Sequence, residues 1–185
     1  MKERIQKETN ERMEKTVDNY KSELTRIRTG KATPSLLDGI VIDYYGTKTP
    51  LNQVANISTP EPRLIVVQPW DKTVINGIEK EIQKANIGLT PNNDGNIIRL
   101  AVPPLTEERR KEIIKTLKQI AEESRIAVRN IRRDAMDELK TAKNNGDIPE
   151  DDEKRLEKKI QELTDKHIED IDKLLDKKEK EIMES

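Results

Sequence analysis

Two stretches of this chain, both after Thr106, carry apolar residues at alternating intervals of three and four. The first holds Ile113, Leu117, Ile120, Ser124, Ala127, Ile131 and Ala135. The second holds Leu156, Ile160, Leu163, His167, Ile171, Leu174 and Ile182. Such sustained spacing is typical of long helices that pack along their whole length, as in coiled coils. Turn-forming residues at Asn144–Pro149 separate the two stretches, so the two helices are expected to be antiparallel.

A third helix is predicted at the start of the chain, from Lys2 to about Thr29, where Gly30 supplies a stop. The helix after Thr106 begins with a threonine cap followed by acidic residues, which suits a helix N-terminus. At 1.5 Å per residue, the second and third helices would each be about 50–60 Å long. A three-helix bundle follows, with its first and third helices parallel. The apolar stripe of the first helix is Ile5, Met13, Val17, Tyr20, Leu24 and Ile27.

Glycine and proline divide the chain, because eight of nine prolines and five of seven glycines fall in residues 31–104. That segment is also poorer in charge than its flanks. We therefore predict an α+β fold. A long antiparallel three-helix bundle (1–30 and 105–185) carries a smaller inserted mixed α/β domain (31–104). Hinges are expected at 29–31 and 103–105, and the hinge residues would be Gly30, Lys31, Pro103, Pro104 and Leu105.

The inserted segment is expected to combine strands with one helix. Apolar runs predict strands at 40–45, 63–68 and 97–102, and Asp71 is placed to cap a helix that runs to about Ala85. Asn93, Asp94 and Gly95 form a hairpin-type turn before the last strand. Tyr44 and Tyr45 lie on the first strand, where alternation turns one ring inward and leaves the other free to stack on a base.

Composition excludes several classes of protein. Without cysteine there are no disulfides and no thiolate chemistry. No stretch approaches the roughly 20 apolar residues of a membrane span, and the first residues lack the apolar run of a signal peptide. Basic residues number 35 and acidic residues 36, so the high charge indicates long solvated helices and not a disordered chain. We expect a cytoplasmic protein that does not contact membranes.

No constellation of residues suggests catalysis, a metal site or a cofactor. His167, the only histidine, falls on an apolar stripe, so core packing explains it. The carboxylates of Asp151, Asp152 and Glu153 fall in the first turn of a helix, where they favour the helix dipole. Residues 92–96 lack the ligand ladder of a calcium loop, and a hairpin turn explains them instead.

The most informative feature is a cluster of arginines on the second helix. Arg125, Arg129, Arg132 and Arg133 recur at helical spacing and span roughly 100° of one side, turned away from the apolar stripe. Arginine can donate two hydrogen bonds to one phosphate, and the 125–133 segment contains no acid. The cluster therefore favours nucleic-acid binding. A solvated charged helix face is the alternative explanation.

Four segments resemble the signature segments of the ribosome recycling factor family, in the family's order and over the whole chain. They are Arg28–Pro34 (RTGKATP), Asp43–Gly46 (DYYG), Pro103–Arg110 (PPLTEERR) and Val128–Arg133 (VRNIRR). The resemblance implies an L-shaped bundle with a hinged insert, of roughly the dimensions of transfer RNA. It also implies a factor that binds the post-termination ribosome, splits the subunits together with elongation factor G and GTP, and releases the mRNA.

The resemblance assigns roles to individual residues. Arg110, Arg129 and Arg132 would contact large-subunit ribosomal RNA near the peptidyl-transferase region, with Arg133 as a further candidate. Arg28, next to the hinge, would be structural or face RNA. The insert would meet elongation factor G and reach toward the intersubunit bridges. We expect a monomer without enzymatic activity.

The chain departs from the family's usual pattern in two places. Residues 86–91 read NIGLTP where the family often has DLGLNP, which leaves the details of that turn open. Many family members end in an aromatic residue, whereas this chain ends in Glu184 and Ser185, so a contact of that ring is not carried over.

Two other functions fit parts of the pattern. A coiled-coil adaptor or chaperone would use the same heptads without binding RNA, and it would form oligomers indifferent to ribosomes. An enzyme housed in residues 31–104 is the second alternative, and the residue inventory argues against it.

Overall fold

The computed structural model describes residues 1–184. Ser185, which stands where many family members end in an aromatic residue, lies outside the described residues. The chain divides into two compact units. One unit combines Met1–Arg28 with Thr106–Glu184, and the other is Thr29–Leu105. A helical unit with a small inserted unit of strands and one helix is the α+β fold class that the sequence predicts.

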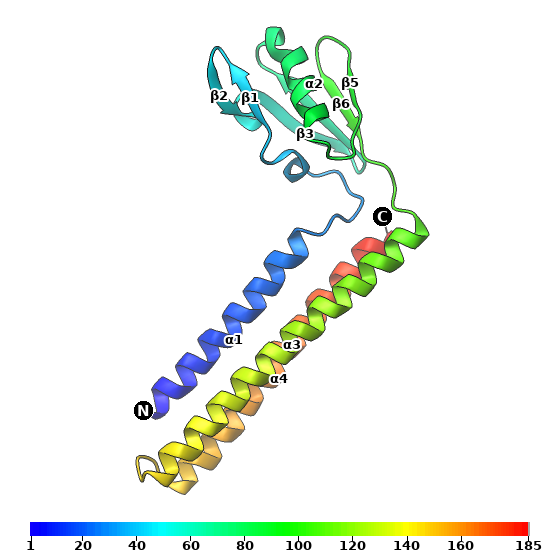
Figure 1. Ribbon diagram of the computed structural model, residues 1–185. Helices are drawn as coiled ribbons and strands as arrows, with labels where there is room; N and C mark the ends of the chain where they lie inside the picture. Colours follow the sequence, from blue (N-terminus) through cyan, green and yellow to red (C-terminus); the bar gives the residue numbers. More distant parts are fainter. Residues whose placement is uncertain (185) are drawn as a thin grey trace. The chain divides into compact units, whose positions relative to one another are not determined.

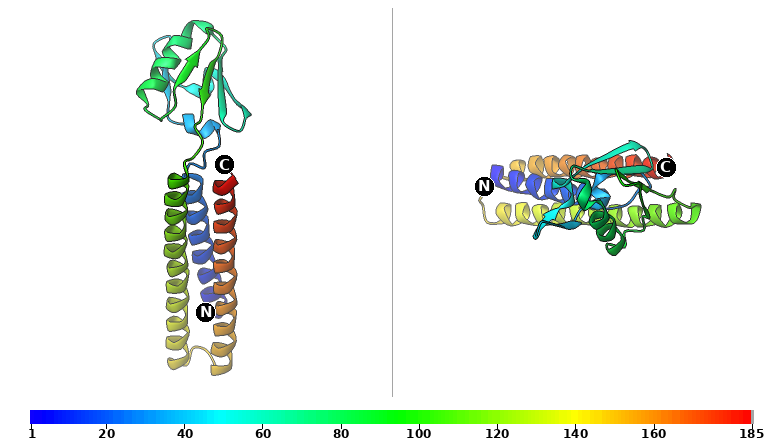
Figure 2. Two further views of the ribbon diagram at one scale, coloured as in Figure 1. Left: turned by 90° about the vertical axis from the view of Figure 1, so that its right-hand side faces the viewer. Right: turned by 90° about the horizontal axis from the view of Figure 1, so that it is seen from above.

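The first unit is a bundle of α1 (Lys2–Thr25), α3 (Glu107–Asn144) and α4 (Glu150–Glu184). These helices run side by side, each in contact with the other two, and α3 is antiparallel to both partners (Figures 1 and 2). With 38 and 35 residues, α3 and α4 are about 57 and 53 Å long. The lengths and directions predicted for these helices are therefore confirmed.

The core of the bundle follows the predicted stripes at most positions but departs from them in the middle of α3. There Ala121 and Val128 are fully buried, whereas Ile120, Ser124 and Ala127 are only half-buried. A helix that packs against two neighbours buries a broad strip of its surface. A strict heptad pattern predicts only a narrow stripe at one edge of that surface. The same effect in α4 buries Thr164 and Leu175 more deeply than Leu163 and Leu174.

The turn between α3 and α4 satisfies the last carbonyl groups of α3. Gly146, with φ of +78°, donates from its amide to Lys143 O at 2.9 Å, and the amide of Asp147 donates to Ala142 O at 2.9 Å. This is the pattern of a Schellman motif, which places glycine in the left-handed region. Ile148 then returns to the core with 3 % exposure, so the turn is anchored at both ends.

α1 ends four residues earlier than the sequence predicts, at Thr25 instead of Thr29. The amides of Arg26 and Ile27 donate to carbonyls only three residues back, Glu23 O and Leu24 O, both at 3.2 Å. The last turn is therefore tightened as in a 3₁₀ helix, and the chain leaves the helix before Arg28.

The second unit contains an antiparallel four-stranded sheet in the order β3-β4-β6-β5. Figure 1 labels three of these strands, β3, β5 and β6. Its strands are β3 (Ala55–Glu61), β4 (Leu64–Pro69), β5 (Pro91–Asn93) and β6 (Ile98–Ala101). The sequence predicts the apolar strands β4 and β6, whereas it gives no sign of the polar edge strands β3 and β5. Alternation is clear in the centre of the sheet, where Ile65, Val67, Ile98 and Leu100 are fully buried on one face.

Helix α2 (Ile75–Lys84) contributes Ile75, Ile78 and Ile82 to the core that these strands form. It begins after a short 3₁₀ turn, Lys72–Val74, in which Asp71 caps the amide of Thr73. The carboxylate of Asp71 accepts from Thr73 N at 3.0 Å and from Thr73 Oγ1 at 2.6 Å. The predicted cap at Asp71 is confirmed, although the α-helix itself starts a turn later.

A separate hairpin joins β1 (Val41–Tyr44) and β2 (Thr47–Pro50). Tyr45 and Gly46 form its two-residue loop with φ of +50° and +82°, which is the backbone of a type I′ turn. Tyr45 is therefore a turn residue and not the strand residue that the sequence predicts. Its ring is 76 % exposed, whereas Tyr44 is half-buried, so one ring does face inward.

Candidate nucleic-acid interface

The arginines predicted as a basic face lie on α3, which begins with a well-formed cap. Thr106 Oγ1 accepts from Arg109 N at 3.1 Å, and Glu107 and Glu108 occupy the first turn, as the sequence predicts. The helix continues without interruption to Asn144. A rigid helix of this length fixes the spacing of its surface charges at one position per turn, about 5.4 Å.

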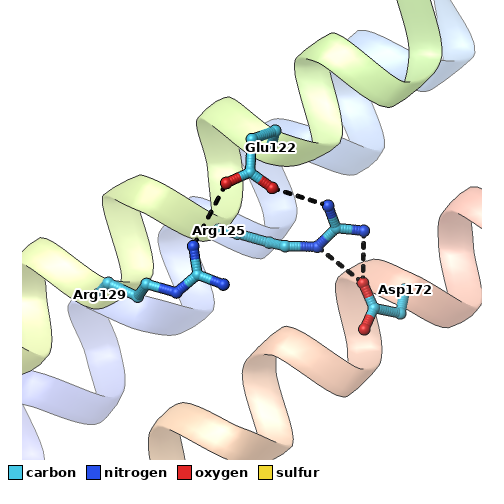
Figure 3. A network of polar contacts seen from close by, with 4 residues as sticks. All are labelled: Glu122, Arg125, Arg129 and Asp172. Carbon is cyan, nitrogen blue, oxygen red and sulfur yellow. Dashed lines mark hydrogen bonds and ion pairs between the residues drawn. The ribbon is translucent and has the colours of Figure 1, made fainter.

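Arg125 is a link between helices and not an open RNA contact. Its side chain is only 21 % exposed. Nε donates to Asp172 Oδ1 on α4 at 2.8 Å, and Nη2 lies 2.6 Å from the same oxygen (Figure 3). Burial alone lowers the pKa of Arg125, but the hydrogen bonds with Asp172 and Glu122 outweigh it and raise the pKa. The guanidinium therefore stays charged and is held on the bundle.

Glu122, one turn before Arg125, adds an acid to the face that looked purely basic over residues 125–133. Its Oε2 accepts from Arg125 Nη1 at 3.0 Å, and its Oε1 accepts from Arg129 Nη1 at 3.3 Å (Figure 3). The hydrogen bond from Arg125, followed by that from Arg129, lowers the pKa of Glu122. The carboxylate is therefore ionised at neutral pH and lies between the two guanidinium groups.

Arg132 and Arg133 follow on the same side of α3. Arg132 Nη1 donates to Gln161 Oε1 on α4 at 3.3 Å, a neutral partner that leaves the charge uncompensated. Arg133 is exposed and forms no ion pair with any of the described residues. The two arginines thus offer free positive charge at the surface of α3.

Arg110 and Arg28 lie outside the central cluster. Arg110 is half-buried near the start of α3, and its Nε is buried without a hydrogen-bond partner among residues 1–184. Arg28 is exposed and follows the end of α1 by three residues. Of the five predicted arginines, only Arg129, Arg132 and Arg133 lie together.

Lysines extend this side of α3 beyond the arginines, and the sequence prediction, which considered only arginines, did not include them. Lys115, Lys118 and Lys140 are exposed and form no ion pair within the described part of the chain. At about 100° per residue they lie within about 40° of Arg129 around the helix axis. Counting lysine at helical spacing would have found them in the sequence.

The predicted hinge residues adjoin two backbone hydrogen bonds that close the second unit. The amide of Ala32 donates to Pro62 O at 2.7 Å, and the amide of Val102 donates to Arg63 O at 2.8 Å. Both ends of the unit are thereby fixed at the turn between β3 and β4. Gly30 has φ of +81°, and Pro103 and Pro104 have no amide hydrogen to donate.

The remaining candidate chemistry is explained by packing. His167 is 3 % exposed in the bundle core, and its Nδ1 lies 2.7 Å from Leu163 O, so that nitrogen carries the proton and donates. No group of three or more potential metal ligands is assembled within residues 1–184. Within the same residues, no helix is both long and apolar enough to span a bilayer.

Comparison with known proteins identifies the family. The family model described as ribosome recycling factor matches residues 20–183. The ribosome-recycling factor of Desulfosudis oleivorans is 56 % identical over 184 residues, covering 100 % of both chains. That of Bacillus subtilis is 52 % identical over 184 residues, again covering 100 % of both.

Solved structures give the same result. A solution structure of ribosome recycling factor is 44 % identical and covers 100 % of this chain and 98 % of its own, with a TM-score of 0.75. Another similar structure holds the T. thermophilus ribosome recycling factor and the E. coli elongation factor G bound to the E. coli post-termination complex. That factor is 43 % identical, with coverage of 98 % for both chains and a TM-score of 0.62.

A long helical bundle with an inserted unit and a basic helix face defines a protein that binds other macromolecules. The chain belongs to the ribosome recycling factor family.

Proposed function

We propose that this protein binds the post-termination ribosome through the basic side of α3 and, together with elongation factor G and GTP, separates the subunits and releases the mRNA. The observation that carries the proposal is the match to ribosome recycling factors over the whole chain. The similar factor seen with elongation factor G on a post-termination complex supports the choice of partners. Acting on ribosomes, the protein would work in the cytoplasm.

The proposed RNA contact is the surface formed by Arg129, Arg132 and Arg133, with large-subunit ribosomal RNA near the peptidyl-transferase region as its ligand. Arginines at the surface without buried acidic partners lose few existing interactions when they bind phosphate. Arg110 and Arg28 would add contacts at the end of the bundle that adjoins the insert. Arg125 is assigned to the bundle and not to RNA, because Asp172 already holds it.

We further propose that Gly30, Lys31 and Pro103–Leu105 act as a hinge between the two units. The hydrogen bonds of Ala32 and Val102 to the β3–β4 turn support this, since they leave only these short links outside the folded body of the insert. Energy for splitting would come from GTP hydrolysis on elongation factor G, so the protein would need no active site of its own. We expect it to act as a monomer.

Polysome breakdown tests the proposal. Purified polysomes, elongation factor G and GTP are incubated with and without this protein, and the products are separated by sedimentation. We expect conversion of polysomes to monosomes and subunits only when the protein, elongation factor G and GTP are all present. Polysomes that stay intact in the complete mixture would instead favour an adaptor that does not act on ribosomes.

A further inference from the structure

Between Lys111 and Lys143, one side of α3 is almost entirely basic, and Glu122 is its only acid. At about 100° per residue, ten charged side chains in this range lie within about 60° of Arg129 around the helix axis. Nine are basic, namely Lys111, Lys115, Lys118, Arg125, Arg129, Arg132, Arg133, Lys140 and Lys143. A single acid in the middle of such a stripe opposes the attraction of the stripe for phosphate.

Glu122 makes the contacts that a phosphate group would make. Each of its carboxylate oxygens accepts a hydrogen bond from a different guanidinium, at 3.0 Å from Arg125 and 3.3 Å from Arg129 (Figure 3). Its side chain is 51 % exposed, so an incoming anion can reach the same groups. Carboxylate and phosphate oxygens compete for arginine because both match its planar donors.

The two arginines respond differently to this competition. Arg125 keeps the carboxylate of Asp172 when Glu122 is removed, so its position does not depend on Glu122. For Arg129, whose side chain is 48 % exposed, Glu122 is the only ion-pair partner among the described residues. An RNA phosphate that binds Arg129 must therefore displace Glu122 or share the guanidinium with it.

We infer that Glu122 is an internal counterion that competes with ribosomal RNA for Arg129 and thereby limits the affinity of the factor for the ribosome. This inference rests on the proposed function, because it assumes that the basic side of α3 binds RNA. A factor that must leave the ribosome after each round benefits from a contact that is easily reversed. Glu122 supplies that reversal from within the protein, since it pairs again with Arg129 as the phosphate departs.

The chain contains a matched control beside this residue. Glu123 is exposed and accepts a hydrogen bond from Gln119 at 3.4 Å. It lies about 100° from Glu122 around the helix axis, outside the basic stripe. Glu123→Gln removes the same charge as Glu122→Gln at the same height on α3. A general effect of net charge appears in both variants, whereas competition for Arg129 appears only in the Glu122 variants.

The experiment measures the affinity of the full-length protein for purified large ribosomal subunits, by equilibrium titration at about 50 mM and about 500 mM salt. Exposed ion pairs are worth about 0.2–1 kcal/mol, so Glu122→Gln should bind about 1.4- to fivefold more tightly at low salt. The gain should shrink at high salt. Glu122→Ala should repeat it, and Glu123→Gln should match the parent.

A double-mutant cycle identifies the group through which Glu122 acts. In an Arg129→Ala background, Glu122→Gln should give only a small part of this gain, because the other basic residues of the stripe remain. The inference is overturned if Glu122→Gln and Glu122→Ala bind like the parent, if Glu123→Gln gains as much, or if the full gain persists without Arg129. If the parent protein itself does not bind the subunits, the proposed function is overturned. If the parent binds and the Glu122 variants show no gain, only the inference about Glu122 is overturned.

Discussion

Arg125 and Asp172 join α3 to α4 across 47 residues of sequence, with Nε and Nη2 of the arginine at 2.8 and 2.6 Å from one carboxylate oxygen. The contact is half-buried on the arginine side and exposed on the aspartate side. Arg125→Met keeps the aliphatic packing and removes the charge. We expect it to lower the free energy of unfolding by about 1–2 kcal/mol, between the values for charged hydrogen bonds and for surface pairs.

The matched variant is Arg133→Met, which removes an exposed arginine without an ion pair in the described part of the chain. It should change the free energy of unfolding by less than about 0.5 kcal/mol. Urea denaturation followed by far-ultraviolet circular dichroism measures both variants. Equal losses would show that Arg125 does not tie the helices together.

The buried hydroxyl group of Tyr20 gives a second prediction for the bundle. The ring is 1 % exposed, its hydroxyl has no hydrogen-bond partner among residues 1–184, and burial raises its pKa to about 12. An unsatisfied buried polar group costs stability, so Tyr20→Phe should leave the free energy of unfolding unchanged or raise it by up to about 1 kcal/mol. A loss of more than about 1 kcal/mol in urea denaturation would mean that the hydroxyl is satisfied, for example by an internal water molecule.

The long elements of the fold could be predicted because their signals are repetitive. Heptad spacing predicts α3 and α4, and Gly146 with Pro149 predicts the turn between them. The polar edge strands β3 and β5 could not be predicted, since they carry little alternation of their own and form by pairing with β4 and β6. The position of Ala121 and Val128 in the core depends on two helix neighbours, which a single stripe does not reveal.

The candidate site could be predicted only in part for a similar reason. Helical spacing places Arg129, Arg132 and Arg133 on one side of α3, and the structure keeps them together. The different role of Arg125 depends on Asp172, which is distant in sequence and opposes it only after the bundle forms. Local sequence therefore identifies which residues share a helix face, but not which of their charges are already neutralised.

The hinge should matter for splitting more than for binding. Gly30 has φ of +81°, which a β-branched residue rarely adopts, so Gly30→Val should restrict the link, while a few glycines added after Lys31 and after Leu105 should loosen it. Both changes should leave ribosome affinity within a few-fold of the parent and slow polysome breakdown. A lengthened variant that splits ribosomes at the parental rate would show that coupling through the links is not required.

Affinity for ribosomes should depend strongly on salt despite the net charge of −1, because local charge on α3 controls phosphate contacts. With three to five such contacts, the slope of log affinity against log salt concentration should be about −2 to −4. Arg129→Ala should make that slope shallower by nearly one. Equilibrium titration across a salt series measures it, and a flat response would indicate that protein contacts dominate.

If the basic side of α3 brings the factor to the ribosome, removing its charges should slow polysome breakdown with elongation factor G and GTP. Arg132→Ala combined with Arg133→Ala removes two charges from this side. The control, Lys166→Ala with Lys177→Ala, removes two from α4, at least about 120° around that helix from Gln161 and Asp172.

At limiting factor concentration the arginine variant should be slower than the parent by about tenfold or more, since a charged hydrogen bond is worth about 1.5–3 kcal/mol. The lysine variant should match the parent, and both should keep parental melting temperatures within a few degrees. An arginine variant that breaks down polysomes as fast as the lysine variant would show that the basic side of α3 does not bring the factor to the ribosome.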